Sequence, residues 1–580
     1  MKKNILFFMI LIASIMLLFF LIYSYKAVSP IKVEISLLEN AFSNNDEIKS
    51  LGKVQDEHIA IISISDNKTS AIVKTKKDSS IKKAYKTVKK QINKYIKEHN
   101  YDAKLIKIDF AKDFQEISLE DLENQLSKLR QEYVFRRGII LSYENGEEII
   151  LTEGEINSNN IIDYDNSEID LEKLNNYLKK CNKNIVKLLP QKLNTFSIIS
   201  YFCDEENNIY EIDPNTGSRK QELTTQSIEN ILNNATSYLS NMIGDEGKYI
   251  YGYFPLKSKE KINRDYNILR HAGATWSLIV KYDSTENQKQ RIDRSLKYLL
   301  DTIQYFDSET AYIEEIKSEE LKLGGNALTS IALCEYIEKF NNSSYLEILE
   351  KLGNGILSMQ NKDGSYNHVL DSYDFSLKDE YRTVYYDGEA TFALCKLYGV
   401  TKNEKYLQAA KKSIQYFIDN NYTKYCDHWI SYSINEITKY VDNESYYEFG
   451  LKNIANNLED IKNKQYTSHI NFEMLLQGFE LYDRILEKKI NVKYLKEFPE
   501  KEFFEILEAR ANFQINSYLY PEIAMYLEIP EKYSDTFYIR HSNYRIRIDD
   551  IQHSILGYYY YYKNFGKIEE YQNKFYDLIF

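Results

Sequence analysis

Hydrophobic and polar positions follow one pattern in the first third of the chain and another in the rest. Between about residues 31 and 215, short apolar runs rich in β-branched residues alternate with amphipathic segments. The runs "HIAIISIS" (58–65) and "SAIVKTK" (70–76) are typical of strands. The segment "SIKKAYKTVKKQINKYIKEH" (80–99) has apolar residues at helical spacing. This part of the chain therefore mixes strands with helices.

The remainder of this first part repeats the same mixture. "AKLIKIDF" (103–110) predicts a strand and "SLEDLENQLSKLRQEY" (118–133) predicts a helix. In "RRGIILSYENGEEIIL" (136–151) a polar turn joins two apolar runs, which indicates a hairpin. "FSIISYFCDEENNIYEIDPNTG" (196–217) predicts a second one. We predict a small α+β domain over residues 31–215, without a recognisable set of catalytic residues.

After about residue 220 strand signals become sparse and pairs of helices follow one another. The first helix of each pair is polar on one face, and these outer-type segments are 226–243, 288–306, 343–360, 404–420, 444–461 and 500–517. The second is more apolar and richer in small residues, and these inner-type segments are 271–283, 324–340, 387–400, 428–441, 469–485 and 549–565. A repeat at this scale indicates one supersecondary unit used again and again.

The last inner segment contains five consecutive tyrosines, residues 558–562. Successive residues of an α-helix are about 100° apart, so five of them go all the way round. A helix that is apolar on every side is buried on every side. We expect this helix to lie between the outer helices and a central cavity.

Six helical hairpins of this kind resemble the (α/α)6 toroid of the six-hairpin glycosidase superfamily, over about residues 220–580. That group includes glycoside hydrolases, polysaccharide lyases and N-acylglucosamine epimerase-like proteins. The resemblance implies carbohydrate chemistry in a bowl at the end where the inner helices begin. Related toroids cyclise terpenes or prenylate proteins, and the sequence has neither the aspartate-rich motif nor the zinc ligands that those would need. The predicted fold class is multi-domain: a transmembrane helix (1–30), a small α+β domain (31–215) and an all-α (α/α)6 toroid (220–580).

Charge, cysteines and the N-terminus narrow the possible partners. The net charge is −12 with acids and bases interspersed, which argues against nucleic acid. The five cysteines lack paired or zinc-type spacing, so we expect no disulfide framework, and no cofactor motif is present. No ligand spacing demands a metal, although Asp and His at neighbouring helix starts could bind one. Lys2 and Lys3 precede an apolar run over about residues 5–23, long enough to span a bilayer. We expect an uncleaved signal anchor with the bulk of the chain extracytoplasmic.

The strongest single candidate for catalysis is "YYDGEATFAL" at the start of the third inner segment. Asp387 and Glu389 are two positions apart, so on a helix they point about 200° apart and only one can face the cavity. One would serve as general acid or base while the other caps the helix or orients a neighbour. The alternative is that Asp387 is simply an N-cap.

The second candidate is "YRIRIDDIQH", a short strand that runs into the last inner segment. Asp549 and Asp550 lie four and three positions before His553, so either aspartate could orient the histidine. The alternative is an N-capping aspartate, with the arginines pairing nearby acids. The catalytic candidates are Asp387, Glu389, Asp549, Asp550 and His553.

Polar and aromatic residues at the inner-segment starts are the candidates for substrate binding. In "RHAG", Arg270 and His271 precede small residues, and a hydrogen-bonded core histidine is the alternative there. The substrate-binding candidates are Arg270, His271, Trp276, Asn326, Tyr386, His428, Trp429, His469, Arg540, His541, Arg545 and Arg547.

The predicted function is a glycoside hydrolase that acts on a cell-envelope or exported polysaccharide. Two carboxylates would do the chemistry, Asp387 or Glu389 opposite Asp549 or Asp550. The first alternative is a polysaccharide lyase or sugar epimerase, in which His271, His541 or His553 exchanges a C–H proton and Arg270 or Arg545 holds a carboxylate. The second alternative is a glycan-binding or assembly factor without catalysis.

Overall fold

The structure is a computed structural model. It describes residues 30–54, 58–127, 136–157, 160–163, 168–256, 266–464 and 466–576. The apolar run over residues 5–23 lies outside these ranges. No helix within them is both long enough and apolar enough to cross a bilayer.

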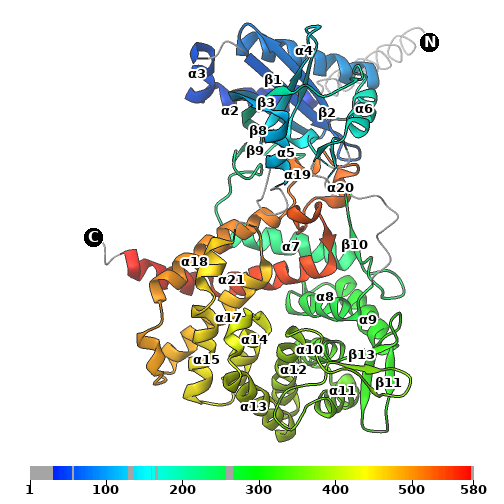
Figure 1. Cartoon of the computed structure of the whole chain (residues 1–580), viewed down its shortest axis with the longest axis vertical. Helices are drawn as coiled ribbons and strands as arrows, with labels where there is room; N and C mark the ends of the chain where they lie inside the picture. The colour runs from blue at the N-terminus through cyan, green and yellow to red at the C-terminus, as the bar shows by residue number, and fades with distance from the viewer. Residues whose placement is uncertain are drawn as a thin grey trace, which may run out of the picture. The chain divides into compact units, whose positions relative to one another are not determined.

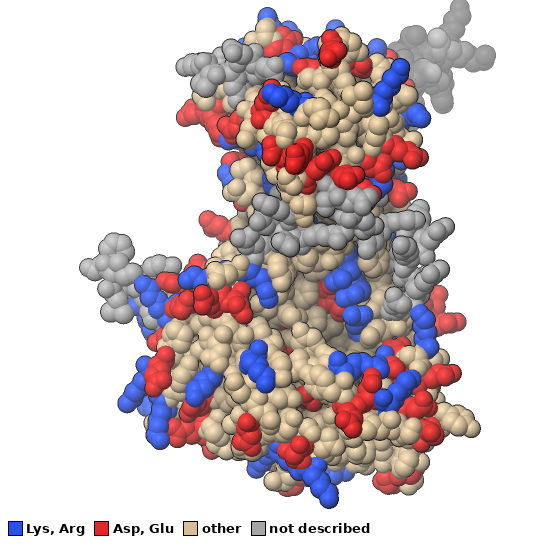
Figure 2. All heavy atoms as spheres, in the orientation of Figure 1, with Lys and Arg blue, Asp and Glu red and all other residues tan. Residues whose placement is uncertain are grey.

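The chain forms two compact units. The sheet unit comprises the described residues up to 221 together with Tyr520–Ser534. The helical unit comprises Glu222–Leu519 and Asp535–Phe580. Acidic and basic side chains are mixed over the visible face of each unit (Figure 2).

One antiparallel sheet organises the sheet unit. Its strand order is β2-β1-β3-β8-β4-β5, and β9 also pairs with β8. The strands are β1 (His58–Ser65), β2 (Ile72–Asp78), β3 (Leu105–Ser118), β4 (Gly138–Ser142), β5 (Glu148–Leu151), β8 (Lys192–Cys203) and β9 (Ile209–Ile212). The helices are α2 (Pro30–Ser43), α3 (Asp46–Val54), α4 (Ile81–His99), α5 (Leu119–Ser127) and α6 (Leu171–Lys180), and β6 (Ile162–Asp163) pairs with β7 (Glu168–Ile169).

The alternation in β1 explains how the sheet is covered. Ile62 and Ile64 point into a core shared with Val88 and Ile92 of α4, which packs on β1 and β2 (Figure 1). Ile61, of the opposite parity, enters a separate apolar cluster, as the two-residue period of a strand requires. The predicted strand at 58–65 and the two predicted hairpins are confirmed. The predicted helix over 118–133 is described only as α5, up to Ser127.

A segment expected in the toroid belongs to the sheet unit instead. Tyr520–Ser534 carries the short helices α19 (Pro521–Ala524) and α20 (Pro530–Tyr533). Met525 and Tyr526 fill an apolar cluster with Leu105, Phe202 and Ile212. The Arg219 guanidinium donates two hydrogen bonds to the buried Glu522 carboxylate, at 3.0 Å and 2.7 Å. The expectation of an uninterrupted toroid from 220 to 580 was therefore wrong, because apolar burial and a bidentate ion pair hold this excursion elsewhere.

Six inner helices form a closed ring in the helical unit. They are α8 (Ile268–Val280), α10 (Leu323–Phe340), α12 (Tyr385–Thr401), α14 (His428–Ile437), α17 (His469–Glu487) and α21 (Ile548–Tyr576). Each packs against the next in this order, and α21 packs back against α8. The outer helices, which pack on the ring, are α7 (Thr225–Asn241), α9 (Glu286–Leu300), α11 (Leu346–Ser358), α13 (Glu404–Asp419), α15 (Glu444–Ala455) and α18 (Glu500–Gln514). This is an (α/α)6 toroid, and its hairpins follow in chain order from green to red in Figure 1.

Two outer segments differ from the prediction, and a second sheet was largely missed. The segment at 288–306 leaves the helix after Leu300 and enters a strand, while 444–461 is broken between α15 and α16 (Leu458–Asn463). The five-stranded sheet runs in the order β11 (Ile303–Tyr305), β12 (Ala311–Glu315), β13 (Glu320–Lys322), β14 (Val369–Asp371) and β15 (Leu377–Asp379). These strands are short, so each gives too few residues for an alternation to stand out.

The tyrosine run lies in the middle of α21. Tyr558 and Tyr561 are buried, and the other three are half-buried, so burial on every side holds only in part. The Tyr558 ring stacks on Phe537 at 5.6 Å, and its hydroxyl donates to the Ala511 carbonyl at 2.9 Å. The run is therefore part of the packing of the toroid.

Candidate functional site

A cavity of about 460 Å³ lies at the N-terminal ends of the inner helices. All six inner helices, or the residues just before them, contribute to its wall. The lining residues are Asn267, Leu269, Arg270, Leu328, Thr383, Tyr385, Tyr386, Glu389, His428, Trp429, His469, Ile470, Arg545, Arg547, Asp549, Asp550, Gln552 and His553. The structure thus brings together most of the residues that the sequence singled out.

Asp387 is not in this cavity. Its side chain is buried, where His368 donates from Nε2 to Oδ1 at 3.1 Å and Tyr422 donates to Oδ2 at 3.2 Å. His368 accepts the Arg382 backbone N–H at Nδ1, at 2.9 Å, which leaves the proton on Nε2. Nor is Asp387 an N-cap, since α12 already begins at Tyr385. Its two oxygens are used inside the protein, and the residue that faces the cavity is Glu389.

His271 and Asn326 are also absent from the cavity wall. His271 is fully buried, with Nδ1 at 2.5 Å from the Tyr266 hydroxyl and Nε2 at 3.0 Å from the Ser295 carbonyl. Burial lowers the pKa of His271 to about 3, so it is a neutral core histidine. The Asn326 amide accepts the Ile313 N–H at 2.6 Å and donates to backbone carbonyls, an architectural role. Trp276, Arg540 and His541 also lie outside the set of lining residues.

The arginines and aspartates of "YRIRIDD" pair with one another. Asp550 accepts two hydrogen bonds from Arg545, at 2.8 Å and 2.7 Å. Asp549 accepts two from Arg547, at 2.5 Å and 2.7 Å, and lies 3.0 Å from Nε of Arg270. Burial opposes ionisation of Asp549, but the charge of Arg547 and then that of Arg270 lower its pKa. Both aspartates are committed to ion pairs, as the alternative interpretation of the sequence had it.

His428 occupies the buried end of the cavity wall, at the start of α14. Asp427 begins this helix by accepting the Trp429 N–H at 2.9 Å, and so fixes where His428 lies. His428 is 3 % exposed, and neither ring nitrogen has a hydrogen-bond partner among the residues that the structure describes. Burial lowers its pKa well below the ordinary value, and the charges of His553 and His469 lower it further. His428 is therefore a neutral imidazole open to a ligand.

His553 lies beside it and has the opposite character. Its ring centroid is 5.3 Å from that of His428, and its Nδ1 is 2.7 Å from Oε1 of Glu473. The Tyr432 hydroxyl donates to the other oxygen of Glu473 at 2.7 Å. Burial opposes a charge on His553, but the Glu473 carboxylate outweighs it and raises the pKa. The prediction that Asp549 or Asp550 orients His553 was wrong, because Glu473 does so.

Within the described part of the chain, one group of side chains could together bind a metal ion. It consists of His428, Glu473 and His553, whose potential ligand atoms lie within 4.8 Å of one another. Two ligands of one zinc ion, each about 2.0 to 2.1 Å from it in a tetrahedral site, lie about 3.4 Å apart. Nδ1 of His553 and Oε1 of Glu473 are only 2.7 Å apart, the distance of a hydrogen bond. The arrangement fits a shared proton better than a shared metal ion.

Glu389 is the carboxyl group of the cavity that lacks a cationic partner among the described residues. Its Oε2 is buried without a hydrogen-bond partner there, and it lies against Gly324, where a side chain would collide with it. Burial raises the pKa of Glu389 well above its ordinary value, and the charge of Asp427 adds to the effect. A neutral Glu389 can donate a hydrogen bond or a proton to a ligand.

Flat aromatic and imidazole rings complete the wall. Tyr385, Tyr386 and Trp429 line the cavity, and His469 stacks on His553 with centroids 5.3 Å apart. Burial lowers the pKa of His469 as well, with His553 contributing. Such rings present an apolar face with a polar edge, which suits the faces of a sugar ring.

Sequence reasoning missed the role of Glu473. A signal was present, because Glu473 follows His469 by four positions and so lies on the same face of α17. Its partner His553 is 80 positions away, on another inner helix. Gln552 and Thr383 also line the cavity without having been singled out.

No protein-family model matches the sequence, and a search of curated proteins finds no match. Solved structures with similar folds include a sugar epimerase from a ruminal bacterium, at 15% identity over 51% of this chain and 88% of that chain, TM-score 0.41. A D-mannose isomerase matches at 12% identity over 59% of this chain and 98% of that chain, TM-score 0.44. A glycoside hydrolase family 76 α-mannanase from Bacteroides thetaiotaomicron matches at 12% identity over 59% of this chain and 97% of that chain, with a TM-score of 0.42.

Proposed function

We propose that the helical unit is a carbohydrate-active enzyme that moves a proton to and from a sugar carbon, as epimerases, isomerases and lyases do. The observation that carries this proposal is a pair of histidines on one cavity wall whose pKa values are shifted in opposite directions. His428 has both nitrogens unpartnered among the described residues and a pKa lowered by burial, whereas Nδ1 of His553 is 2.7 Å from Glu473, which raises its pKa. Their centroids are 5.3 Å apart. The first can act as a base and the second as an acid.

In this mechanism His428 removes the proton from a carbon next to a carbonyl or carboxylate group of the sugar. The electron pair of the broken C–H bond forms a C=C bond to the carbonyl carbon, the π pair of the C=O bond moves to oxygen, and a negative charge develops on that oxygen. Glu389, neutral because it is buried, donates a hydrogen bond to this oxygen. His553 then gives its proton to carbon, which yields an epimer or isomer, or to a departing sugar oxygen, which yields an unsaturated product.

Glycoside hydrolysis is the second candidate, and Glu389 is the observation that favours it. A carboxyl with a raised pKa is what a general acid needs to protonate a leaving oxygen. The second carboxylate is harder to assign, since Asp549 and Asp550 are engaged by arginines. The structure therefore offers one of the two carboxyl groups that glycoside hydrolysis needs.

Product analysis in isotopically labelled water separates these reactions. The protein would be incubated with saccharides from its own cell envelope, in deuterium oxide and separately in ¹⁸O-water, and the products analysed by mass spectrometry. The proposal expects deuterium on carbon and no ¹⁸O in a new reducing end. Label from ¹⁸O-water in fragments would support hydrolysis instead. Binding without any product would favour a glycan-binding factor.

We also propose that the protein is anchored in a membrane through residues 5–23, with the two units outside the cytoplasm. The proposal rests on the sequence, an apolar run preceded by Lys2 and Lys3. An extracytoplasmic position would give access to a cell-envelope or exported polysaccharide. Protease treatment of intact cells tests it: digestion of the chain from outside supports the proposal, and full protection contradicts it.

A further inference from the structure

Three exposed tyrosines lie around the start of α12, where the sequence contains the candidate motif "YYDGEATFAL". They are Tyr381, which is 57 % exposed, Tyr385, which is 38 % exposed, and Tyr425, which is 40 % exposed. Single exposed apolar side chains are common on proteins, whereas several at one place mark a binding surface. Tyr385 also lines the main cavity, so this group of tyrosines begins at the proposed reaction site.

One buried carboxylate links the supports of Tyr381 and Tyr425. Asp387 accepts a hydrogen bond from His368 at one oxygen and from Tyr422 at the other. The His368 ring lies against Tyr381, with centroids 4.8 Å apart, and the Tyr422 ring lies against Tyr425, at 5.1 Å. Asp387 therefore holds in place the two rings on which these exposed tyrosines rest.

The same support reaches the wall of the main cavity. Tyr386 lines the cavity, and its ring centroid is 5.4 Å from that of His368. The Tyr385 ring centroid is 6.1 Å from that of His428, the proposed base. Aromatic rings thus continue from His428 outward to Tyr381.

The turn that carries Tyr425 is fixed at both ends. This turn, η5 (Tyr422–Tyr425), lies between Asn421 and Cys426, and both of these residues have a φ of 52°. Residues other than glycine adopt this left-handed conformation rarely, so the path of the chain is sharply defined here. His428 follows Tyr425 by three positions, which ties the exposed ring to the proposed base.

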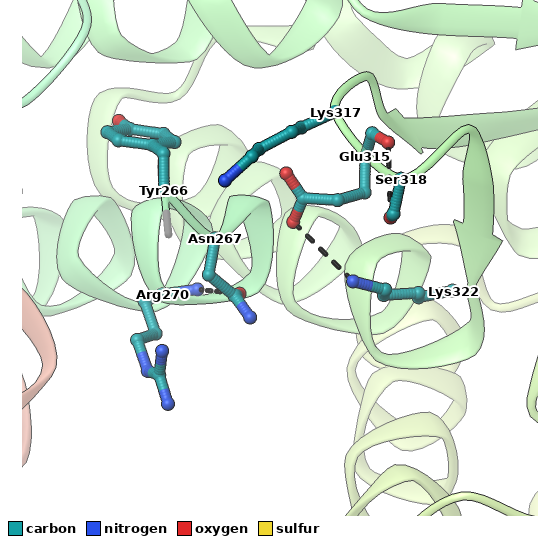
Figure 3. Close-up of a pocket in the computed structure, with 7 residues that line it drawn as sticks. All are labelled: Tyr266, Asn267, Arg270, Glu315, Lys317, Ser318 and Lys322. Atoms are coloured by element: carbon teal, nitrogen blue, oxygen red, sulfur yellow. Dashed lines mark hydrogen bonds and ion pairs between the residues drawn. The ribbon is translucent and has the colours of Figure 1, made fainter. Parts of the chain in front are cut away.

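A second cavity, of about 320 Å³, adjoins the main one at the start of α8 and has a different character (Figure 3). Arg270 lines both cavities and is 3.0 Å from Asp549. Lys322 is 3.4 Å from Glu320 and 3.8 Å from Glu315, the contact drawn in Figure 3. These charges are used within the protein, whereas the three tyrosines remain exposed.

We propose that the substrate is a saccharide chain, and that Tyr385, Tyr381 and Tyr425 bind the sugar units that extend beyond the reacting one. The apolar face of a tyrosine ring packs against the C–H face of a sugar, and the hydroxyl at its edge can hydrogen-bond to sugar hydroxyls. Because this packing needs no charge, the surface selects for chain length more than for the identity of each unit. The inference rests on the proposed sugar chemistry in the main cavity.

The test measures how binding depends on the length of the saccharide. The probe is polysaccharide from the protein's own cell envelope, partially hydrolysed and sorted by size from single sugars to hexamers. Binding would be measured by native mass spectrometry with the wild-type chain and a Tyr381→Ala, Tyr425→Ala variant, since neither residue lines the main cavity. A Tyr305→Ala, Tyr373→Ala variant, which removes two exposed tyrosines of the five-stranded sheet region, is the matched control.

We expect the wild type and the control to bind the longest fragments about tenfold or more tightly than single sugars. The Tyr381→Ala, Tyr425→Ala variant should lose most of this gain and bind single sugars as the wild type does. A Tyr381→Phe, Tyr425→Phe variant keeps both rings and should keep most of the gain. Equal losses in the Phe and Ala variants would contradict binding through the ring faces.

The inference is overturned if no protein prefers the longer fragments, or if the Ala variant keeps the preference. Carbon-bound deuterium, measured on the same fragments in deuterium oxide, reports separately on the proposed chemistry. Length-dependent binding without exchange would leave the tyrosine surface standing and remove the proton-transfer mechanism. Exchange without length dependence would leave the mechanism standing and remove the tyrosine surface.

Discussion

Each unit of the chain buries a cluster of charged or ionisable side chains, and the two clusters differ in how their charges are paired. In the sheet unit, Lys107 is buried at 3.4 Å from Asp109 and 3.2 Å from Glu153, and Arg136 is 2.6 Å from Glu153. Every charge there has an opposite charge beside it. In the helical unit, Glu389 faces a cavity without a cationic partner among the described residues, and His428, whose Nδ1 lies 3.6 Å from Asp427, lines the same cavity without a hydrogen-bond partner there.

This difference separates a structural cluster from a candidate active site. Burial opposes a charge on Lys107, yet Asp109 and the other neighbours outweigh it and raise its pKa, so Lys107 is held charged, while burial raises the pKa of Asp109. Protein groups that are buried and still lack a partner are rare, and they call for an explanation. Asp109, Glu153 and Arg136 each have one such atom as well, so in the toroid it is the adjoining cavity, lined by His428 and Glu389, that points to a ligand.

The largest expected effect comes from replacing His428 or His553. We expect His428→Asn or His553→Asn to lower kcat/KM by a factor of about 10² to 10⁴, the usual contribution of a general base or acid. Thermal unfolding of His428→Asn should change little, because His428 makes no hydrogen bond with the described residues that the substitution would break. His553→Asn removes the partner of the buried Glu473, so its activity is measured per folded molecule. His541→Asn, outside the cavity wall, is the control and should stay within about threefold of the wild type. Equal losses in all three variants would contradict the assignment.

Lys107→Met tests whether the charged cluster of the sheet unit is structural. Removing one partner of a buried ion pair leaves an unpaired charge and costs about 3 to 5 kcal/mol. We therefore expect a clear fall in the free energy of unfolding of the sheet unit. The measurement is urea denaturation, followed at the transition in which the sheet unit unfolds. The activity per folded molecule should be unchanged. A loss of activity without loss of stability would show that the cluster has a functional role.

Glu473→Gln should alter the pH profile more than the rate at its optimum. A base with a lowered pKa is active above that pKa, and an acid with a raised pKa is active below it. The wild-type kcat/KM should therefore have an acidic limb below 6.5, from His428, and an alkaline limb above 6.5, from His553. Replacing the Glu473 carboxylate should move the alkaline limb toward lower pH. An unmoved limb would mean that Glu473 has only a packing role.

Gly324→Ala is the mildest of these changes. The added methyl group would collide with Oε2 of Glu389, so that Glu389 must shift. We expect a severalfold loss of kcat with little change in secondary structure. Gly566→Ala in α21 is the matched control, because nothing lies within 4 Å of the new Cβ. That control should stabilise the chain by about 0.5 to 1 kcal/mol. Equal activity of the two variants would argue against a role for Glu389.

The sequence was sufficient to predict the ring but not the contacts within the site. Helical periodicity and the alternation of polar and apolar segments located all six hairpins and the inner-helix starts. It also showed that only one of Asp387 and Glu389 can face the cavity. Which one does so depends on the rotation of α12, and that is set by tertiary packing, such as the close approach of Gly324 to Glu389.

Long-range pairs lay beyond sequence reasoning altogether. The contact between Glu473 and His553 joins two inner helices 80 positions apart. Local spacing favoured Asp549 or Asp550 as the partner, yet Arg547, two positions before Asp549, and Arg545, five positions before Asp550, engage both. The excursion Tyr520–Ser534 was missed for the same reason, since its partners Arg219 and Leu105 lie some three hundred positions or more earlier.

The central claim is that the cavity holds a neutral His428 beside a charged His553, and it can be tested without knowing the substrate. The measurement is an NMR titration of the chain labelled with ¹³C-histidine. The chain has eight histidines, and the signals of His428 and His553 would be assigned by their loss in the His428→Asn and His553→Asn variants. The account predicts that His428 titrates below its ordinary value of 6.5 and His553 above it. Titration of both near 6.5, or a shift of both in the same direction, would contradict it.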